Sequence, residues 1–433
     1  MKAFIMAGGK GTRLVEITKD LLPKPMVKLF DKPMLQRSIE TLKEYGVDEV
    51  YISVGYMHEI IEDYFNNIDL GVKINFIVED EPLGSGGALY YVKDIMDDDF
   101  VVCNGDSLFS IDIDKMMEFH KSHNAYATLM THSNFHPYDS DLLICDSDNR
   151  VIELARKDVE RDYYYRNNVN AGFFIISPKA LYYYQNLPEA TKLGMEHDFI
   201  NQLILDGKAV YSYKSTEYFK DVGTPSRYYQ ALLDIENNVL DKKNLKNKQK
   251  AIFLDRDGTL NVYKGFLKSA EELEILDTVP EALGLINNSE YLAIIVSNQP
   301  VIARGECSTA EQENIFNKLE TLLGQQGVYV DARYYCPHHP DSGFPGEVKE
   351  LKIKCNCRKP NIGMLEKASA DFNLDLSQCV IIGDTDMDIQ TGKNANIPTI
   401  RVTTGKVEEP KVVADYTFDN LYDAVKFVID NKI

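Results

Sequence analysis

The stretch KAFIMAGGKGTRL, residues 2–14, joins six strand-like residues to a glycine-rich loop. A second stretch of the same kind, AIFLDRDGTL, residues 251–260, runs from a short apolar segment into acidic residues and a glycine. In α/β domains, ligands bind at the carboxyl ends of the strands, where such turns lie. Because the chain contains this arrangement twice, we predict two α/β domains, each with a ligand site directly after its first strand.

Further apolar runs follow both stretches, and helical patterns lie between those of the first half. Because strands that alternate with helices build parallel sheets covered on both faces, we predict two Rossmann-like three-layer domains. The expected strands are Lys2–Ala7, Glu49–Val54, Lys73–Val78 and Phe100–Asn104, then Ala251–Leu254, Tyr291–Val296 and Cys379–Ile382; the expected helices are Met34–Tyr45 and His58–Phe65.

The alternation fades near residue 235, where the sequence reads ENNVLDKKNLKNKQK. Five lysines fall between Asp241 and Lys250, which is typical of an interdomain linker or of a solvated helix end. We favour the linker, and predict domains at residues 1–238 and 251–433 joined by residues 239–250.

Composition limits the classes of function. The 433 residues carry a formal net charge of −20, so a nucleic-acid-binding surface is not expected, whereas metal ions and local Lys/Arg clusters still allow phosphorylated small-molecule substrates. The sequence contains neither a long apolar run nor an export signal, so we expect a cytoplasmic protein without a membrane span. The seven cysteines then indicate a metal site rather than disulfides.

The first loop has the composition of a phosphate cradle. Gly8, Gly9 and Gly11 let backbone N–H groups approach phosphates, while Lys10 and Arg13 supply charge. Its spacing fits neither the dinucleotide fingerprint nor the P-loop. Together with Pro23-Lys24-Pro25-Met26, the loop resembles the signature of the sugar-1-phosphate nucleotidyltransferases, and the likeness covers about residues 1–235. The tract between the two motifs is about one residue shorter than usual, with Val15-Glu16 where Arg-Pro is common.

The resemblance implies roles for particular residues. The glycine loop would hold the nucleoside triphosphate, Arg13 and Lys24 would neutralise phosphates, and Asp106 with Asp221 would hold Mg²⁺. The further positions implied for the nucleotide and the sugar phosphate are Gly8, Gly9, Gly11, Thr12, Gly84, Gly87, Lys157, Asn170 and Gly172. Lys157 can also be read as a solvated charge, and Asn170–Gly172 as a strand-start turn. Glu196 and Asp198 fit either sugar hydroxyls or a helix amino-terminus.

The second stretch resembles the opening motif of the haloacid dehalogenase phosphatases. Ser297-Asn298, Lys359 and the Gly383-Asp384 turn with Asp388 follow in the family's order. The resemblance implies that Asp255 attacks phosphorus, that Asp257 protonates the leaving group and then activates water, and that Asp255, Asp257 and Asp384 bind Mg²⁺. Ser297, Asn298 and Lys359 would contact the phosphoryl group or the rest of the substrate.

A cysteine- and histidine-rich segment lies between these motifs. Cys336, His338, Cys355 and Cys357 offer three thiolates and one imidazole, a closed tetrahedral set typical of structural zinc. His339 is not expected as a ligand, because His338 has the two-residue spacing that Cys355 and Cys357 repeat. Zinc would fix the loop that carries Arg358 and Lys359.

Within the phosphatases, these segments resemble the heptose-1,7-bisphosphate 7-phosphatases, with the histidinol phosphatases as near relatives. The resemblance implies that Arg304 and Arg358 recognise the distal phosphate and the sugar. Pro300-Val301 replaces a common Ser-Gly, and Thr385 stands where a basic residue is frequent.

The two resemblances together imply one pathway. The second domain would remove the 7-phosphate of a heptose bisphosphate, and the first would couple the heptose 1-phosphate to GMP from GTP. Alternatives stay open here: another sugar such as mannose, another nucleotide, a histidinol-phosphate-like substrate, or a second domain that only binds phosphosugar and regulates. The anomer, channelling between the domains and the oligomeric state, including a homo-oligomer, also stay open.

Overall fold

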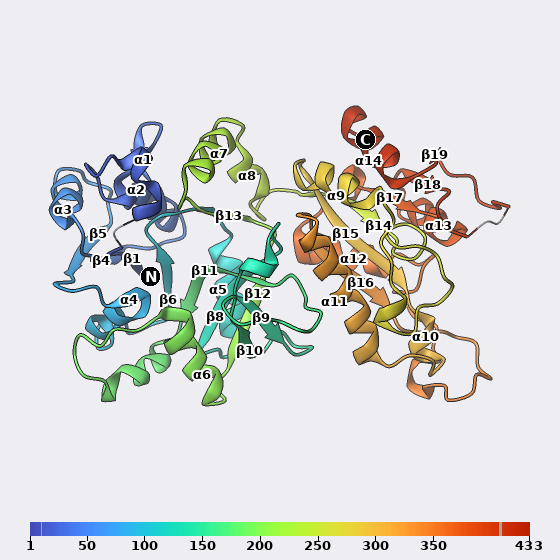
Figure 1. Ribbon diagram of the computed structural model, residues 1–433, viewed down its shortest axis with the longest axis horizontal. Coiled ribbons are helices and arrows are strands. Elements are labelled where there is room, and N and C mark those ends of the chain that lie inside the picture. The colour runs from blue at the N-terminus through green and yellow to red at the C-terminus, as the bar shows by residue number, and fades with distance from the viewer. Residues whose placement is uncertain (10, 407–408) are drawn as a thin grey trace. The chain divides into compact units, whose positions relative to one another are not determined.

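The computed structural model describes residues 1–9, 11–406 and 409–433 (Figure 1). By its internal contacts the chain forms two compact units. The first contains Met1–Thr131, Asp141–Arg156 and Asn170–Asn244, and the second contains His132–Ser140, Lys157–Val169 and Leu245–Ile433. Two short segments from the first half of the sequence are therefore part of the second unit.

The first unit is built on a nine-stranded mixed sheet. Strand β1 (Lys2–Ala7) lies between β4 (Glu49–Val54) and β6 (Phe100–Asn104), parallel to both, and β5 (Lys73–Val78) forms one edge beside β4. On the far side of β6 the sheet continues through β11 (Val169–Ile176), β9 (Leu142–Cys145) and β10 (Val151–Ala155), while β8 (Ala127–His132) joins β11 to β12 (Val210–Lys214). The four strands expected from residues 2–104 are confirmed.

Alternate residues of β1 enter different cores. Phe4 packs into one hydrophobic cluster, whereas Ala3 and Ile5 pack into another. Because successive side chains of a strand point to opposite faces, two clusters mean that the sheet is covered on both sides, which confirms a three-layer unit. The helices of this unit are α1 (Val15–Thr18), α2 (Met34–Glu44), α3 (His58–Asn66), α4 (Gly84–Gly87), α5 (Ile113–Ser122), α6 (Asn201–Leu205), α7 (Pro225–Glu236) and α8 (Val239–Lys243).

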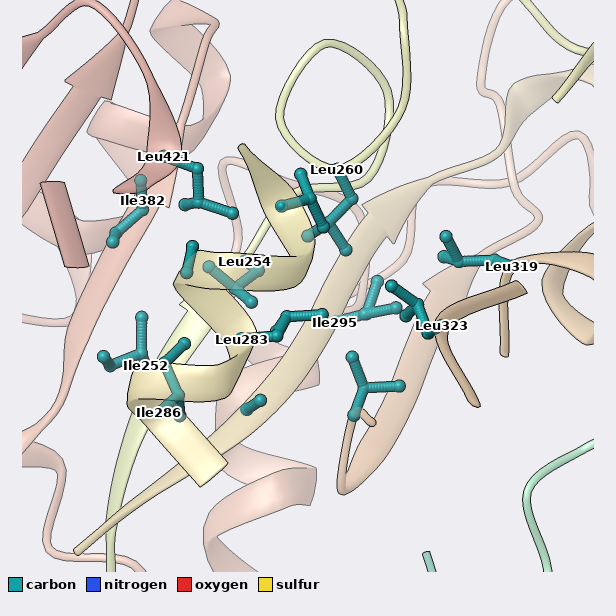
Figure 2. Packing of buried hydrophobic residues seen from close by; sticks show 14 of the residues in the cluster. Ile252, Leu254, Leu260, Leu283, Ile286, Ile295, Leu319, Leu323, Ile382 and Leu421 are labelled. Carbon is teal, nitrogen blue, oxygen red and sulfur yellow. The ribbon is translucent and has the colours of Figure 1, made fainter. Parts of the chain in front are cut away.

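The second unit has a six-stranded, fully parallel sheet. The strand order is β16-β15-β14-β17-β18-β19, formed by Ala332–Cys336, Tyr291–Asn298, Lys250–Leu254, Val380–Gly383, Thr399–Val402 and Tyr416–Phe418. Ile252 and Leu254 of β14 enter the cluster of Figure 2, and Ala251 and Phe253 enter the cluster on the other face. This unit is therefore three-layered as well.

Helices from several parts of the second unit close the cluster of Figure 2. Leu283 and Ile286 come from α9 (Val279–Asn287), Leu319 and Leu323 from α11 (Thr309–Gln325), and Leu421 from α14 (Leu421–Asn431). The remaining helices are α10 (Pro300–Ala303), α12 (Gly363–Phe372) and α13 (Asp386–Asn394). Pro300, one of the two departures from the phosphatase motif, begins α10, where a missing N–H costs nothing.

The segment expected as a linker, residues 239–250, is partly structured. It contains α8, and the chain passes from one unit to the other between Asn244 and Leu245. Val239 and Leu240 pack against a cluster of the first unit, and Leu245 is buried in the second. Apolar side chains of this segment therefore pack against both units, while the proposed domain bounds of 1–238 and 251–433 stay a prediction.

The internal segment Lys157–Val169 is anchored on α11, within the second unit. The N–H of Asn167 donates to Glu320 Oε2 at 2.7 Å, and the N–H of Tyr165 donates to Thr321 Oγ1 at 2.9 Å. Both acceptor side chains are buried. In the described part of the chain, no helix has both the length and the hydrophobicity of a membrane span.

Candidate active sites

The glycine loop of the first unit packs against the segment that carries Lys24. Gly11 has φ +61°, and a Cβ there would lie 2.6 Å from Lys24 Cβ. Glycine therefore allows both the backbone conformation and the close approach. Thr12 and Arg13 follow in an exposed 3₁₀ turn. Lys10, expected to add charge, lies outside the described residues.

Two expected metal ligands and Lys24 meet at the end of β6. The Lys24 ammonium forms an ion pair with Asp106 and lies 3.4 Å from Asp221 Oδ1, and Arg227 Nη1 lies 2.9 Å from Asp221 Oδ2. A short antiparallel ribbon of β7 (Ser107–Ser110) and β13 (Tyr218–Asp221) places Asp221 opposite Ser107. The structure thus brings together an acidic pair that already surrounds a cation, and carboxylate oxygens suit Mg²⁺.

The segment expected to face the nucleobase turns tightly beside residues 191–195. Gly84 has φ +77°, and a Cβ there would lie 2.3 Å from the carbonyl oxygen of Leu193. A Cβ on Gly87 would lie 2.8 Å from the carbonyl oxygen of Thr191. Only glycine fits at Gly84, so the position of this backbone depends on that residue type.

The residues implied for the sugar divide into two groups. Asn170 Nδ2 lies 3.4 Å from Glu196 Oε1, and Gly172, at φ +79°, lies beside Asn104. Burial raises the pKa of Glu196. Asp198 accepts a hydrogen bond of 2.6 Å from the N–H of Gly194, as a helix amino-terminus requires. By contrast, Lys157 is exposed and belongs to the second unit.

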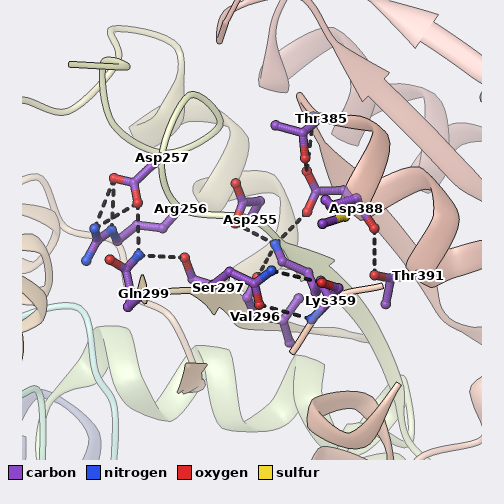
Figure 3. Close-up of polar contacts among 12 residues, drawn as sticks. Asp255, Arg256, Asp257, Val296, Ser297, Gln299, Lys359, Thr385, Asp388 and Thr391 are labelled. Carbon is purple, nitrogen blue, oxygen red and sulfur yellow. Dashed lines mark hydrogen bonds and ion pairs between the residues drawn. The ribbon is translucent and has the colours of Figure 1, made fainter. Parts of the chain in front are cut away.

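Three buried carboxylates meet at the carboxyl ends of β14 and β17. Asp255 follows β14, Asp384 follows β17, and Asp388 lies in the first turn of α13; one oxygen of each lies within 4.8 Å of the others. Lys359 Nζ donates to Asp255 Oδ1 at 2.7 Å and to Asp388 Oδ1 at 2.5 Å (Figure 3). The parallel pairing of β14 with both β15 and β17 creates this meeting point.

The charges at this point call for a cation. Burial and the neighbouring carboxylates raise the pKa of Asp255 to about 8 and that of Asp384 to about 7. Asp384 Oδ1 is buried and has no hydrogen-bond partner among the described residues. A divalent cation would stabilise the ionised form of these buried carboxylates and would give the unpaired oxygen of Asp384 a partner. The residues therefore fit Mg²⁺.

The carboxylate of Asp257, also expected among the metal ligands, is not part of this group of three. It accepts hydrogen bonds from Arg256 and Gln299 (Figure 3). Asn261 Nδ2 donates to the same carboxylate at 3.2 Å. Arg256 is the adjacent residue and fully buried, and its guanidinium forms a charge-assisted contact that orients this carboxylate. The sequence motif fixes the position of Asp257 in the loop but not the direction of its side chain.

Ser297 and Asn298 end β15, close to Lys359. The side-chain amide of Asn298 forms two hydrogen bonds with the backbone of Lys359. Its Nδ2 donates to the carbonyl oxygen at 3.1 Å, and its Oδ1 accepts from the N–H at 3.0 Å. Asn298 therefore holds the lysine loop in place, a role that the sequence did not indicate. Thr385, the second departure, is the N-cap of α13 and forms a capping box with Asp388: the Thr385 side chain accepts from the Asp388 N–H, and Asp388 Oδ2 accepts from the Thr385 N–H at 3.0 Å.

Arg401 was missed by sequence reasoning. It comes from β18, donates to the carbonyl oxygen of Asp384 at 2.8 Å and to Asp386 at 2.6 Å, and so supplies charge beside the position where a basic residue was expected. No local motif marks it, because a strand residue reaches this turn only through sheet pairing.

Arg304 is fixed between two aromatic rings. Its guanidinium carbon lies 4.8 Å from the ring centre of Phe266 and 4.6 Å from that of Phe344, and Nη2 donates to His339 Nε2 at 3.1 Å. Burial and the charges of Arg358 and Arg304 lower the pKa of His339, so its ring stays neutral and accepts this bond. The cluster of possible metal ligands at this place contains His338 and the three cysteines.

The four expected zinc ligands lie together. The Sγ atoms of Cys336, Cys355 and Cys357 lie 3.3 to 3.5 Å apart, and His338 Nδ1 lies 3.3 Å from Cys357 Sγ. The hydrogen bond between Cys357 and Cys336 is the main cause that lowers the pKa of the Cys357 thiol, to about 5, so a thiolate forms readily. This donor set fits a tetrahedral zinc ion. Arg358, next in the chain, donates to the carbonyl oxygen of His338 at 3.2 Å.

Comparisons with known proteins match each half of the chain separately. Residues 2–238 match the family model of the nucleotidyl transferases, and residues 356–424 match a HAD-hydrolase-like model. The chain is 36% identical over 242 residues to D-glycero-alpha-D-manno-heptose 1-phosphate guanylyltransferase of Aneurinibacillus thermoaerophilus, covering 55% of this chain and 100% of that relative. It is also 36% identical over 184 residues to D-glycero-beta-D-manno-heptose-1,7-bisphosphate 7-phosphatase of Haemophilus ducreyi, covering 42% of this chain and 98% of that relative.

Among solved structures, HddC from Yersinia pseudotuberculosis matches with a TM-score of 0.46 and 28% identity, over 54% of this chain and 99% of that one. Each of the two relatives is covered almost completely. The two family models match different halves of the chain. The chain therefore belongs to the nucleotidyl transferase family in its N-terminal half and to the HAD-like hydrolases in its C-terminal half.

Proposed function

We propose that the chain is a bifunctional enzyme of GDP-heptose formation. It hydrolyses the 7-phosphate of D-glycero-α-D-manno-heptose 1,7-bisphosphate and then transfers GMP from GTP to the heptose 1-phosphate, releasing pyrophosphate. One observation carries this proposal: this single chain matches a heptose 1-phosphate guanylyltransferase and a heptose-1,7-bisphosphate 7-phosphatase, each over almost its full length. The product of the second activity is the substrate of the first.

In the phosphatase site, Asp255 attacks the phosphorus of the 7-phosphate, and the bond from phosphorus to the sugar oxygen breaks. Asp257 gives its proton to the leaving alkoxide. Water then attacks phosphorus while Asp257 takes its proton, and the bond to Asp255 breaks to release inorganic phosphate. Lys359 and Ser297 neutralise and bind phosphoryl oxygens. Mg²⁺, when held by Asp255, Asp384 and Asp388, supplies the charge that lets an anionic nucleophile approach an anionic ester.

In the transferase site, an oxygen of the sugar 1-phosphate attacks the α-phosphorus of GTP, and pyrophosphate leaves. Lys24 and Arg13 neutralise phosphate charge, and the glycine loop binds phosphates through its N–H groups. Asp106 and Asp221 would hold a second Mg²⁺, which screens the repulsion between the two anions. Gly84, Gly87, Asn170 and Gly172 position the nucleotide and the sugar. Lys157 remains a proposal for the sugar phosphate.

The two relatives differ in the anomer that their names state. The transferase relative carries the alpha form in its name, and the phosphatase relative carries the beta form. If both domains act in sequence, one anomer must suit both. We assign the α form because the transferase relative, which acts on the phosphate of the anomeric carbon, has the alpha form in its name. GTP and phosphosugars are cytoplasmic metabolites, and zinc-binding thiolates persist in a reducing compartment, which supports a cytoplasmic enzyme.

The test is a one-pot assay of the purified chain with Mg²⁺ and either anomer of the heptose 1,7-bisphosphate. GTP, ATP, CTP and UTP are supplied in parallel, and phosphate, pyrophosphate and sugar nucleotide are quantified. We expect all three products with the α anomer and GTP. Phosphate release without any sugar nucleotide would contradict the assigned transferase substrate. Histidinol phosphate and mannose 1-phosphate serve as comparison substrates, and faster turnover of either one would overturn the heptose assignment for that domain.

A further inference from the structure

Gln299 lies between two groups that the proposed phosphatase reaction uses. Its Nε2 donates to Ser297 Oγ at 2.9 Å and to Asp257 Oδ2 at 2.9 Å (Figure 3). Gln299 and Ser297 are each 1% exposed, so no solvent competes for these bonds. The two hydrogens of the Gln299 amide nitrogen therefore point to two different acceptors. One is the Ser297 hydroxyl, which is proposed to bind the phosphoryl group, and the other is Asp257, the proposed general acid and base.

The charge of Asp257 decides which way this amide points. A reversed amide would set Gln299 Oε1 against the carboxylate, so that two acceptors would face each other. Arg256 holds the same carboxylate, with Nη2 at 3.0 Å from Oδ1 and 2.8 Å from Oδ2, and its guanidinium lies 4.7 Å from the ring centre of Phe316. The carboxylate therefore has a fixed orientation, and so does the amide.

The amide in turn sets the direction of the Ser297 proton. A serine hydroxyl has one hydrogen and two lone pairs. Gln299 occupies one lone pair of Ser297 Oγ, so the hydroxyl hydrogen of Ser297 is free to donate to another acceptor. In the proposed reaction that acceptor is the phosphoryl group, which would lie next to Asp255. The same contact keeps the Asp257 carboxylate beside this hydroxyl.

We propose that Gln299 is a positioning residue of the phosphatase, which aims the Ser297 hydroxyl at the phosphoryl group and holds Asp257 beside it. The inference rests on the proposed phosphatase activity but not on the identity of the sugar. It gives a chemical reason for glutamine at this place: a side chain with two donor hydrogens on one atom is needed to serve two acceptors.

The experiment compares Gln299→Met with the unaltered chain on two substrates. 4-Nitrophenyl phosphate has a leaving group that departs without a proton, whereas a sugar phosphate needs one from Asp257. We expect kcat to fall about tenfold on 4-nitrophenyl phosphate through Ser297, and about a further tenfold or more on the sugar phosphate, as loss of a general-acid contribution predicts. KM should change less than kcat.

A double variant separates positioning from a general structural effect. If Gln299 acts through Ser297, Ser297→Ala with Gln299→Met should be no slower on 4-nitrophenyl phosphate than Ser297→Ala alone. Gln312→Met is the matched control, because Gln312 is fully buried in α11 and its amide has no hydrogen-bond partner among the described residues. It should keep the kcat of the unaltered chain.

Three outcomes would overturn the proposal: an unchanged kcat in Gln299→Met, equal losses on both substrates, or additive losses in the double variant. Zinc content and the melting temperature identify a variant that does not fold. If Gln299→Met does not fold, Gln299→Glu replaces it, because it keeps the shape of the side chain but sets a second carboxylate against Asp257. Gln299→Glu should then also lose more kcat on the sugar phosphate than on 4-nitrophenyl phosphate. Turnover of 4-nitrophenyl phosphate by the unaltered chain tests the phosphatase itself, so its absence points to the proposed function and not to Gln299.

Discussion

Lys359 Nζ lies 2.7 Å from Asp255 Oδ1, although 104 positions separate the two residues in the chain. Both side chains are buried, and Lys359 also forms an ion pair with Asp388. A single buried ammonium therefore faces Asp255, the proposed nucleophile, and the neighbouring carboxylate of Asp388. Its positive charge opposes the effect of burial, which raises the pKa of Asp255.

We predict that Lys359→Met lowers phosphate release by about 10² to 10³, the loss typical of one preorganised electrostatic donor. Without the ammonium the pKa of Asp255 rises further above about 8, so more of the nucleophile is protonated near neutral pH. The residual rate should therefore increase as the pH is raised. Phosphate release measured across a pH series checks this. Lys367→Met, at an exposed lysine of α12, is the control and should keep the rate.

The two candidate sites should fail independently. Asp255→Asn removes the attacking oxygen and should abolish phosphate release, while pyrophosphate release from GTP and supplied sugar 1-phosphate continues. Asp221→Ala removes one of the two carboxylates around Lys24 and should silence transfer alone. Separate assays of the two half-reactions on each variant provide the measurement. If either substitution stops both reactions, the sites are not independent, and normal transfer in Asp221→Ala would remove that residue from the metal site.

Loss of zinc should disable the phosphatase. Cys357 directly precedes Arg358 and Lys359, so a cluster without its metal releases the loop that carries the lysine. Cys357→Ser should lower zinc content, the melting temperature and phosphate release together. Cys145→Ser, at a cysteine of the first unit outside the cluster, is the control and should change none of them. Full phosphatase activity in zinc-free protein would contradict a structural role for the metal.

Alanine substitutions at Gly84 and Gly46 distinguish the cost of a positive φ from the cost of a steric clash. Both have a positive φ, +77° and +78°, but a Cβ on Gly84 would meet the Leu193 carbonyl oxygen at 2.3 Å, whereas nothing lies within 4 Å of one on Gly46. Gly46→Ala should cost about 1 to 2 kcal/mol of stability and leave transfer intact. Gly84→Ala should cost more and impair transfer, because the backbone of residues 84–87 must move. Chemical denaturation and the KM for GTP measure both effects, and equal behaviour of the two variants would mean that close packing of residues 84–87 is unimportant for transfer.

Much of the fold followed from local patterns. Each expected strand of the first unit spans the residues of β1, β4, β5 and β6, because runs of apolar residues that end in glycine or polar turns indicate buried parallel strands whatever their surroundings. The segment after residue 238 was harder to interpret, because Val239, Leu240 and Leu245 gain their partners only from distant parts of the chain.

The sequence by itself determined the two families and the order of the motifs along the chain, since motifs such as DRDGT and CPHH…CNC are local and can be recognised without knowledge of the fold. The tertiary structure alone decided which of them meet. It placed Asp388 with Asp255 and Asp384, turned the Asp257 carboxylate to Arg256 and Gln299, and assigned the segment with Lys157 to the second unit. The physical reason is that a side chain's direction depends on competition among partners from separate elements, and sheet pairing and burial bring those partners together only in the folded chain.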